Sequence, residues 1–333
     1  MKQINIRNVA EAAGTSIASV SRCLNDKSGV STPVRRRIVA AAQKLGYDIH
    51  FAKRRILALI LPTIQVPSLG FYSIQMIDAL RTAMAAHNFG CFIISREDIG
   101  LLSEVLISGA ISFDYLKEVG YEFPNMKNIP LVCLNDIGNH LEQVYHVHSD
   151  EEDGISKAME HLYNNHHTRI GFLYFNEQRS IVGSSYRCQA FRKTAERLAI
   201  SQSCFIQHQT KDIPAHEAVG MLLQKQCTAL IVAGEDMAPP VRRALFVLGK
   251  RVPEDISLIT AETVQSRFQI PRETTIAQDF PRLAEESIRL LERMIRGDRE
   301  LGDIAVPYIL NIRETVRDLY AQNSTTAPVS IPE

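Results

Sequence analysis

The sequence lacks tryptophan and has only six cysteines among its 333 residues. The cysteines form no Cys-x-x-Cys pair and are scattered singly through apolar stretches, as reduced buried cysteines usually are. Neither a disulfide framework nor a zinc site is therefore expected. The tight histidine pairs, His146 with His148 and His166 with His167, are more typical of surface histidines than of metal ligands. We expect no metal and no cofactor.

Long apolar runs are also missing. No run reaches the roughly 18 residues that a transmembrane helix needs, and the polar stretch Met1–Arg7 lacks the apolar region of a signal peptide. We therefore expect a cytoplasmic protein with no membrane partner. Hydrophobic residues make up 45% of the chain and charged residues 22%. This is globular composition, and the length allows two or three domains.

The chain as a whole has no excess of either charge, because 37 basic residues balance 37 acidic ones. That balance conceals a split along the sequence. Residues 1–55 hold eleven Lys or Arg and three Asp or Glu, a net +8, which leaves −8 on the remainder. A basic segment on an acidic body is typical of a nucleic-acid-binding module, although a chance fluctuation gives the same numbers.

Three short helices are predicted in the basic segment. Apolar residues recur at helical spacing over Ile6–Ala13, and Gly14 is suited to end that helix. Ser16 can then cap a second helix, Ile17–Leu24. A third helix, from about Pro33 to Leu45, has proline in its first turn and glycine after its last. A helix, a glycine turn and a second short helix make a helix-turn-helix unit.

The same segment resembles the DNA-binding head of the LacI/GalR family of repressors. The match covers Ile6–Asn25 and Val30–Tyr47 and includes the family's Val-Ala, Ala-Gly-x-Ser, Val-Ser-Arg, Leu-Asn and Leu-Gly-Tyr marks. Docking of the second helix in the major groove places Ile17, Ala18 and Arg22 at base edges, where Arg22 can form paired bonds to guanine. The short polar side chains suited to phosphate oxygens are Ser16, Ser19, Ser21, Asn25 and Ser31. For the serines, capping and solvent exposure are the alternative.

The hinge after the head departs from the family pattern. In most of the family, Leu-Gly-Tyr leads into a short helix whose leucine enters the minor groove. Here residues 48–55 read Asp-Ile-His-Phe-Ala-Lys-Arg-Arg, and the first strand of the body is expected at once from Ile56. Whether a hinge helix forms is left open, but the basic run containing Arg54 should favour DNA electrostatically.

Apolar strand-like runs alternate with amphipathic helices over residues 56–320, which predicts parallel sheets. The pattern resembles the family's two-lobed, periplasmic-binding-protein-like body. The expected fold class is therefore α/β, with a three-helix helix-turn-helix head on that body. We expect the head at residues 1–47 and a shortened hinge at 48–55. The ligand-binding and dimerisation body follows in two lobes, the first at 56–148 with 281–306 and the second at 149–278 with 307–320. Residues 321–333 are expected to form a disordered tail.

Candidate ligand contacts follow from the resemblance. They are two aromatic rings, an amide, an arginine and two carboxylates: Phe71, Tyr72, Asn135, Arg187, Glu235 and Glu262. In the family, the arginine grips ligand oxygens with its planar fork; an ion pair between the lobes is its alternative role. Both glutamates are one methylene longer than the usual residues, and the amide replaces a common aspartate. The rings can stack on a sugar or pack in the core.

These features predict a sequence-specific transcription regulator, a repressor, whose operator affinity is switched by a sugar in the cleft between the lobes. The first lobe is short, because only about a dozen residues separate Ser95 from the strand expected at Leu106, where the family usually has a longer helix. In this it resembles a minority branch of the family, that of the evolved β-galactosidase repressor, and the resemblance implies a galactoside as ligand. Paired heads on a palindromic operator imply a homodimer. An activator, or a ligand-binding protein without catalytic activity, stays open. An enzyme is not expected, because the sequence has no nucleophile elbow, P-loop or dinucleotide fingerprint.

Overall fold

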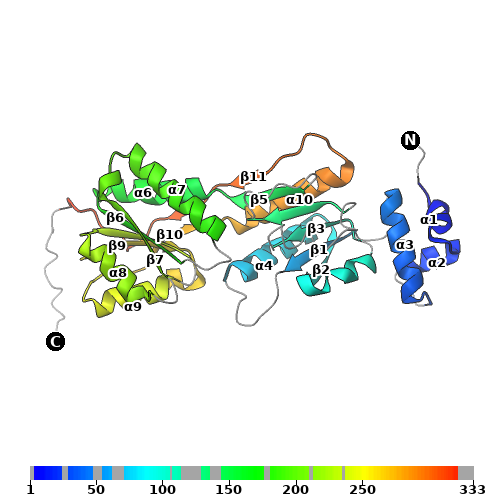
Figure 1. The fold of residues 1–333 in the computed structure, drawn as a ribbon, viewed down its shortest axis with the longest axis horizontal. Helices are drawn as coiled ribbons and strands as arrows, with labels where there is room; N and C mark the ends of the chain where they lie inside the picture. Colours follow the sequence, from blue (N-terminus) through cyan, green and yellow to red (C-terminus); the bar gives the residue numbers. More distant parts are fainter. Residues whose placement is uncertain are drawn as a thin grey trace, which may run out of the picture. The chain divides into compact units, whose positions relative to one another are not determined.

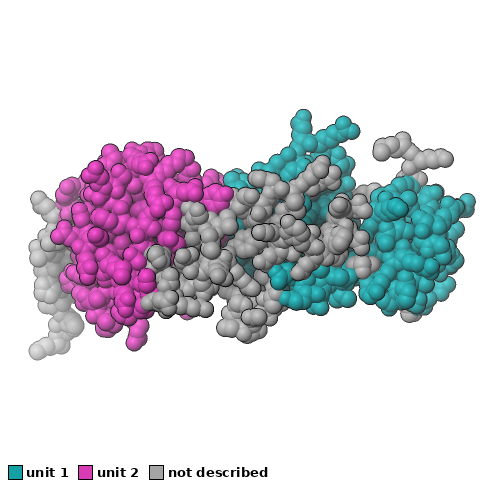
Figure 2. Space-filling view, viewed as in Figure 1, with its two compact units in different colours: residues 1–149, 280–306 teal, residues 150–279, 307–333 magenta. Residues whose placement is uncertain are grey.

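The computed structural model describes most of the chain: residues 4–24, 29–47, 55–61, 71–105, 107–113, 129–135, 144–175, 181–209, 213–234 and 237–321. The chain forms two compact units, residues 1–149 with 280–306 and residues 150–279 with 307–333 (Figures 1 and 2). Each unit of the body contains one six-stranded, mainly parallel sheet, so the predicted α/β fold class is confirmed. Within the described residues, no helix is long and apolar enough to cross a membrane.

The head consists of α1 (Ile6–Ala13), α2 (Ile17–Leu24) and α3 (Thr32–Leu45). Its buried core is Val9, Ala10, Ala13, Val20, Cys23, Ile38, Val39, Ala41 and Ala42. Leu24 and Leu45 are apolar too, but they are only partly buried because each is the last residue of its helix. The small residues inside α3 fill the centre instead, which lets three short helices pack closely.

Backbone caps define the ends of the head helices. Gly14 and Gly46 adopt the left-handed conformation, with φ of 60° and 61°, as expected for residues that follow a helix. Ser16 caps α2, since its Oγ accepts the Ser19 N–H at 3.1 Å. The start of α1 has a cap that the sequence analysis missed: the Asn5 side chain accepts two backbone N–H groups of the first turn. Such caps are worth about 1 kcal/mol each.

The first body sheet has the strand order β11-β5-β4-β3-β1-β2, and all neighbours are parallel. The strands are β1 (Arg55–Leu61), β2 (Phe89–Ser95), β3 (Gly109–Ser112), β4 (Leu131–Leu134), β5 (Val144–Ser149) and β11 (Ile304–Val306). Helices α4 (Phe71–Ala86) and α10 (Phe280–Arg296) pack together against one face. The opposite face is covered by a short 3₁₀ segment, η2 (Arg96–Ser103), which buries Ile99 and Leu102.

The second body sheet has the order β12-β10-β9-β8-β6-β7, and only β12 is antiparallel to its neighbour. The strands are β6 (Ile170–Phe175), β7 (Cys204–Gln209), β8 (Ala229–Ala233), β9 (Ser257–Ala261), β10 (Thr274–Ala277) and β12 (Ile309–Asn311). Helices α6 (Glu151–Asn164) and α7 (Ile181–Arg197) cover one face. Helices α8 (Ala215–Gln224) and α9 (Ala238–Val247) cover the other.

Some sequence expectations about the body need correction. Strands β5, β7, β10, β11 and β12 are not predicted by apolar runs, because they are edge or near-edge strands that are short or rich in polar residues. Cys91 is exposed and Cys204 is partly exposed, whereas all six cysteines are expected in the core. Both lie on outer strands, β2 and β7, where one face of the sheet is less covered. The expected tail lies, after residue 321, outside the described residues.

His167 provides a pH-dependent contribution to the stability of the second unit. Its Nδ1 lies 2.9 Å from Thr228 Oγ1 and its Nε2 lies 3.0 Å from the Arg317 carbonyl oxygen. A neutral ring satisfies both contacts, accepting at one nitrogen and donating at the other. The side chain is fully buried, and this desolvation lowers the pKa of His167 from 6.5 to about 4.

We therefore expect stability to rise with pH between about 4 and 6.5, because in that window only the unfolded chain binds the proton at this residue. The stabilisation is fully present above the unfolded pKa and is lost as the pH falls towards the folded one. The difference between the unfolded and folded pKa values of His167 corresponds to about 3 kcal/mol in the free energy of unfolding. Urea unfolding between pH 4.5 and 7 measures the slope, and His167→Gln should reduce it. An unchanged slope in that variant would contradict the assignment.

Candidate functional sites

Helix α2 presents the side chains that are expected at base edges. Ile17, Ala18 and Arg22 are all exposed, and Ile17 retains 43% of its surface, although it is a large apolar residue. Val20 and Cys23 turn to the opposite side and are buried against the other head helices. One face of this eight-residue helix is thus buried in the core, and the other is exposed and can enter a DNA groove.

The polar residues expected at phosphates are distributed around this helix. Ser16 and Ser31 are exposed, whereas Ser19 and Ser21 are partly exposed. The Ser16 and Ser19 hydroxyls lie 2.9 Å apart, so one donates to the other. Ser31 occupies the N-cap position of α3 but makes no capping bond with its side chain. Two further candidates, Asn25 and Arg54, lie outside the described residues, as do residues 48–54 of the expected hinge. Arg55, the last residue of the expected hinge, is instead the first residue of β1.

In the first body unit, Tyr72 and Asn135 are brought into contact. Asn135 Nδ2 donates to the Tyr72 hydroxyl at 3.0 Å, and Asn135 Oδ1 accepts the Ser149 N–H at 2.8 Å. The Tyr72 ring is half-buried and packs against Phe113 and Phe280, with centroid distances of 6.3 and 5.8 Å. The ring of Tyr72 therefore packs against other aromatic rings, whereas its hydroxyl makes a hydrogen bond. Phe71 begins α4, but its side chain is not among the described ones.

Arg187, on α7, is engaged by a carboxylate of its own unit. Its Nε and Nη2 donate to the two oxygens of Glu151 at 2.7 and 2.8 Å. Tyr308 adds a hydroxyl hydrogen bond to the same carboxylate at 3.2 Å. Desolvation opposes the charged guanidinium, but Glu151 outweighs it and raises the pKa of Arg187. The ion pair considered as this residue's alternative role exists, but it lies within the second lobe and does not link the lobes.

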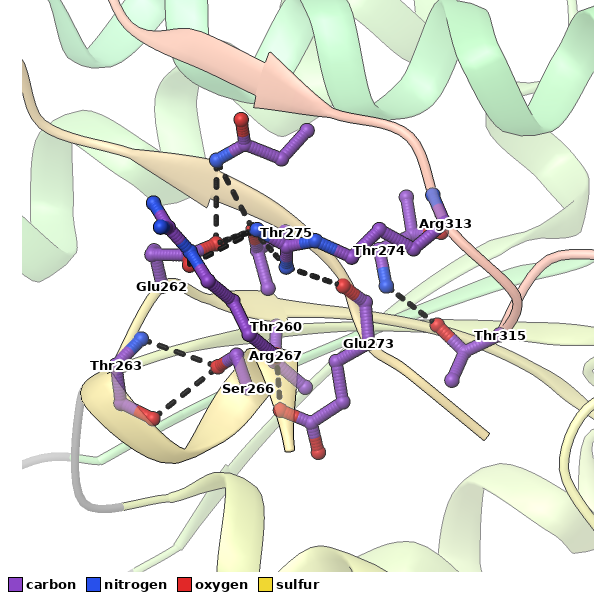
Figure 3. Close-up of polar contacts among 11 residues, drawn as sticks. Thr260, Glu262, Thr263, Ser266, Arg267, Glu273, Thr274, Thr275, Arg313 and Thr315 are labelled. Carbon is purple, nitrogen blue, oxygen red and sulfur yellow. Dashed lines mark hydrogen bonds and ion pairs between the residues drawn. The ribbon is translucent and has the colours of Figure 1, made fainter. Parts of the chain in front are cut away.

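Glu262 follows β9 and lies in a cluster of polar side chains (Figure 3). Arg313 Nη2 lies 2.9 Å from both carboxylate oxygens, and Asn311 Nδ2 donates to one of them at 3.1 Å. The Thr275 hydroxyl donates to the same oxygen, and Arg267 Nε lies 3.4 Å from the other. A carboxylate has about four acceptor positions. Donors of this chain thus occupy all of them.

The cluster continues beside Glu262 through a second buried carboxylate. Glu273, 3% exposed, receives Arg242 Nη1 at 3.2 Å and the Thr260 hydroxyl at 3.3 Å. Arg313 Nη1 also donates to the Glu273 carbonyl oxygen at 2.6 Å, so one guanidinium joins both parts of the cluster. The residues of the whole cluster come from α9, from β9 and the residue after it, from the 3₁₀ segment η5 (Val264–Arg267), from β10 and the residue before it, and from β12 and the segment after it. The cluster therefore fixes the edge of this sheet.

Sequence reasoning missed the partners of Arg187 and Glu262. A signal for one of them was present: the polar residues Asn311 and Arg313 alternate with the apolar Leu310 and Ile312, and the antiparallel β12 pairs Asn311 with Thr275. Period-two alternation places such residues on one face of a sheet. Glu151 gave no comparable signal. Glu235, the other expected carboxylate, lies outside the described residues.

Comparison with known proteins assigns this architecture. Residues 5–48 match the family model for bacterial regulatory proteins of the lacI family, and residues 159–316 match the model for a periplasmic binding protein-like domain. The chain therefore carries a LacI-type helix-turn-helix head followed by a periplasmic-binding-protein-like body. The fold, with a helix-turn-helix head and two parallel-dominated sheets, agrees with both matches.

The relatives that this chain matches over most of its length are transcription regulators. It is 26% identical to the regulator reg1 of Streptomyces lividans over 88% of this chain and 90% of the relative. It is 25% identical to the repressor PurR of Haemophilus influenzae over 94% and 99%. A Lac repressor dimer bound to operator and anti-inducer has a TM-score of 0.64 at 24% identity, covering 95% and 100% of the two chains. The protein is a DNA-binding regulator with a ligand-binding type of body, and not an enzyme.

Proposed function

We propose that this LacI-family regulator is a homodimeric repressor that reads a palindromic operator with α2 and responds to a sugar. The observation that carries the proposal is the exposed face of α2, where Ile17, Ala18 and Arg22 lie on the side opposite the buried core. The proposed DNA contacts also include the polar residues Ser16, Ser19, Ser21, Asn25, Ser31 and Arg54. We propose that the head comprises residues 1–47 and that the hinge comprises residues 48–55.

The sugar response is proposed for the body, with a galactoside as the first candidate. A polyhydroxylated ligand needs polar groups at its rim and apolar contact at its faces. Tyr72, Asn135 and Arg187 offer such polar groups, and Phe71 and Glu235 complete the proposed contact set. Because Glu151 takes the Nε–Nη2 edge of Arg187, a sugar would meet the Nη1 side of that guanidinium. For Glu262 we propose a supporting role behind the ligand, since its acceptor positions are occupied.

Selection from randomised duplex DNA tests the DNA-reading part. Purified protein is mixed with the pool at fixed salt, because phosphate contacts make affinity salt-dependent, and the bound fraction is sequenced. We expect a two-fold symmetric consensus with half-sites about one helical turn apart. Binding without sequence preference, with and without sugars, would contradict the proposal. Transcription in vitro from a promoter carrying the consensus then separates a repressor from an activator.

Arg22→Ala is expected to lower affinity for the selected operator by about 5- to 150-fold, because a paired bond to guanine is worth 1–3 kcal/mol. The preference for one base in each half-site should relax at the same time. Lys44→Ala removes the same charge from the last turn of α3 and serves as the control. It should leave the consensus unchanged. Equal loss of discrimination in both variants would exclude Arg22 as a base-reading residue.

A further inference from the structure

The Glu151 carboxylate, at the first position of α6, is held in place by a second residue besides Arg187. The Tyr308 hydroxyl donates to its Oε2 at 3.2 Å. Tyr308 is itself anchored to α6, because its N–H donates to Asp153 Oδ2 at 2.8 Å and its carbonyl oxygen accepts Lys157 Nζ at 2.6 Å. Only 12% of the Glu151 side chain is exposed. The carboxylate therefore has little freedom to leave the arginine.

The Arg187 guanidinium is only partly used by this carboxylate. A guanidinium has five N–H donors, and Glu151 takes the edge formed by Nε and Nη2. Among the described residues, none accepts a hydrogen bond from Nη1 of Arg187, and 24% of this side chain is exposed. The Nη1 side can therefore donate to a ligand. Its positive charge, in contrast, is already matched by the adjacent carboxylate, so the pair offers hydrogens without a net charge.

The other charges at the start of α6 give an anion no further attraction. Four acids stand there, and three cations of the same unit pair with members of this group, which leaves one negative charge in excess. The acids are Asp150, Glu151, Glu152 and Asp153, and the cations are Arg187, Lys193 and Lys157. An anion at Arg187 would lie close to the Glu151 carboxylate, whose repulsion offsets the attraction of the guanidinium. The anion would still lose its hydration.

We propose that Glu151 is a specificity-determining residue, which neutralises Arg187 and so restricts the effector to uncharged ligands that carry hydroxyl groups. A hydroxyl or ring oxygen can accept a hydrogen bond from the Nη1 side without bringing a charge of its own. A sugar phosphate or a sugar acid needs an unpaired guanidinium and is disfavoured. This inference rests on the proposed function, because it takes Arg187 as an effector contact, and it narrows the effector from sugars in general to uncharged ones.

Binding of inorganic phosphate tests the role of Glu151 without any sugar. Glu151→Gln keeps the size of the side chain and removes its charge, which leaves Arg187 without a counter-charge. Calorimetric titration of the full-length protein at constant ionic strength should reveal a phosphate site in this variant that the unaltered protein lacks. The site should be lost again when Arg187→Met is added.

Glu152→Gln is the matched control, because it removes the same charge from an exposed ion pair with Lys193, and it should add no site. The DNA-binding head can bind phosphate in every variant, so only the differences between variants count. Glu151→Gln that is folded, as judged by circular dichroism, and binds no more phosphate than the unaltered protein would overturn the inference. An added site that persists with Arg187→Met would overturn it as well.

Sugar selectivity of the unaltered protein is a second test, which does not depend on the folding of a variant. Methyl galactoside, galacturonate and galactose 6-phosphate are compared by the concentration at which each changes operator affinity. We expect the uncharged sugar to act at a concentration about tenfold lower than either acid, because a hydrogen bond to an unpaired charge is worth at least that factor and the acids find none here. An acid that acts as well as the galactoside would overturn the inference. If none of the three sugars acts, the galactoside proposal fails, and the phosphate titration still decides the role of Glu151.

Discussion

Glu151→Ala is expected to lower the free energy of unfolding by about 3–5 kcal/mol, because it leaves the guanidinium of Arg187 in a low-dielectric site with no counter-charge. The two side chains are 12% and 24% exposed, so water screens the pair weakly. The Tyr308 hydroxyl would lose its acceptor in the same step. Urea unfolding at neutral pH measures the change.

The neighbouring residue provides a matched control. Glu152 also pairs with a cation of α7, with its carboxylate 2.6 Å from Lys193 Nζ, but the two side chains are 57% and 68% exposed. Glu152→Ala should cost no more than about 1 kcal/mol, as exposed ion pairs do. Replacing both Glu151 and Arg187 with methionine should recover part of the loss, since no charge is then left unpaired. Equal effects of Glu151→Ala and Glu152→Ala would contradict the burial argument.

Arg313→Met is expected to have the second large effect, a loss of about 3 kcal/mol or more. It leaves the Glu262 carboxylate, 12% exposed, with neutral donors and with the distant, largely exposed Arg267. It also removes the donor to the Glu273 carbonyl oxygen, so the edge of the second sheet loses two links at once. Methionine retains much of the arginine stem, which limits the loss of packing.

A second ion pair at the same sheet edge serves as the control for Arg313. Arg272 pairs with Glu314, the residue next to Arg313, but those side chains are 61% and 46% exposed. Arg272→Met should therefore change stability by no more than about 1 kcal/mol. If the two methionine variants were equally stable, the Glu262 cluster would be a surface feature and Glu262 would again be available to a ligand.

The head could be predicted nearly residue by residue because its signals are local. Glycine after a helix, serine before one and apolar residues at helical spacing each act within one or two turns. The roles proposed for Arg187 and Glu262 depended on the opposite kind of information. Their partners, Glu151 and Arg313, are 36 and 51 residues away in sequence. Whether a polar side chain is open to a ligand depends on such distant neighbours, which no local pattern encodes.

The sheets show the same limit. Central strands such as β4 and β8 are continuous apolar runs and were predicted, because both of their faces are covered by other elements. Strand β5 reads Val-Tyr-His-Val-His-Ser, which is not an apolar run, yet three of its six residues are buried, and His146 is 1% exposed. Its neighbours β4 and β11 come from sequence regions far apart, so its burial follows from the topology and not from its composition.

The order in which the strands join each sheet has a consequence for synthesis on the ribosome. The first body sheet needs β11 beside β5, and its core needs α10, so it is incomplete until residue 306 has emerged. The second sheet is likewise incomplete until its edge strand β12 has been synthesised. The head, in contrast, is one continuous segment that buries its own core. A nascent chain therefore carries a folded, positively charged DNA-binding module for most of its translation, before any part of the body can regulate it.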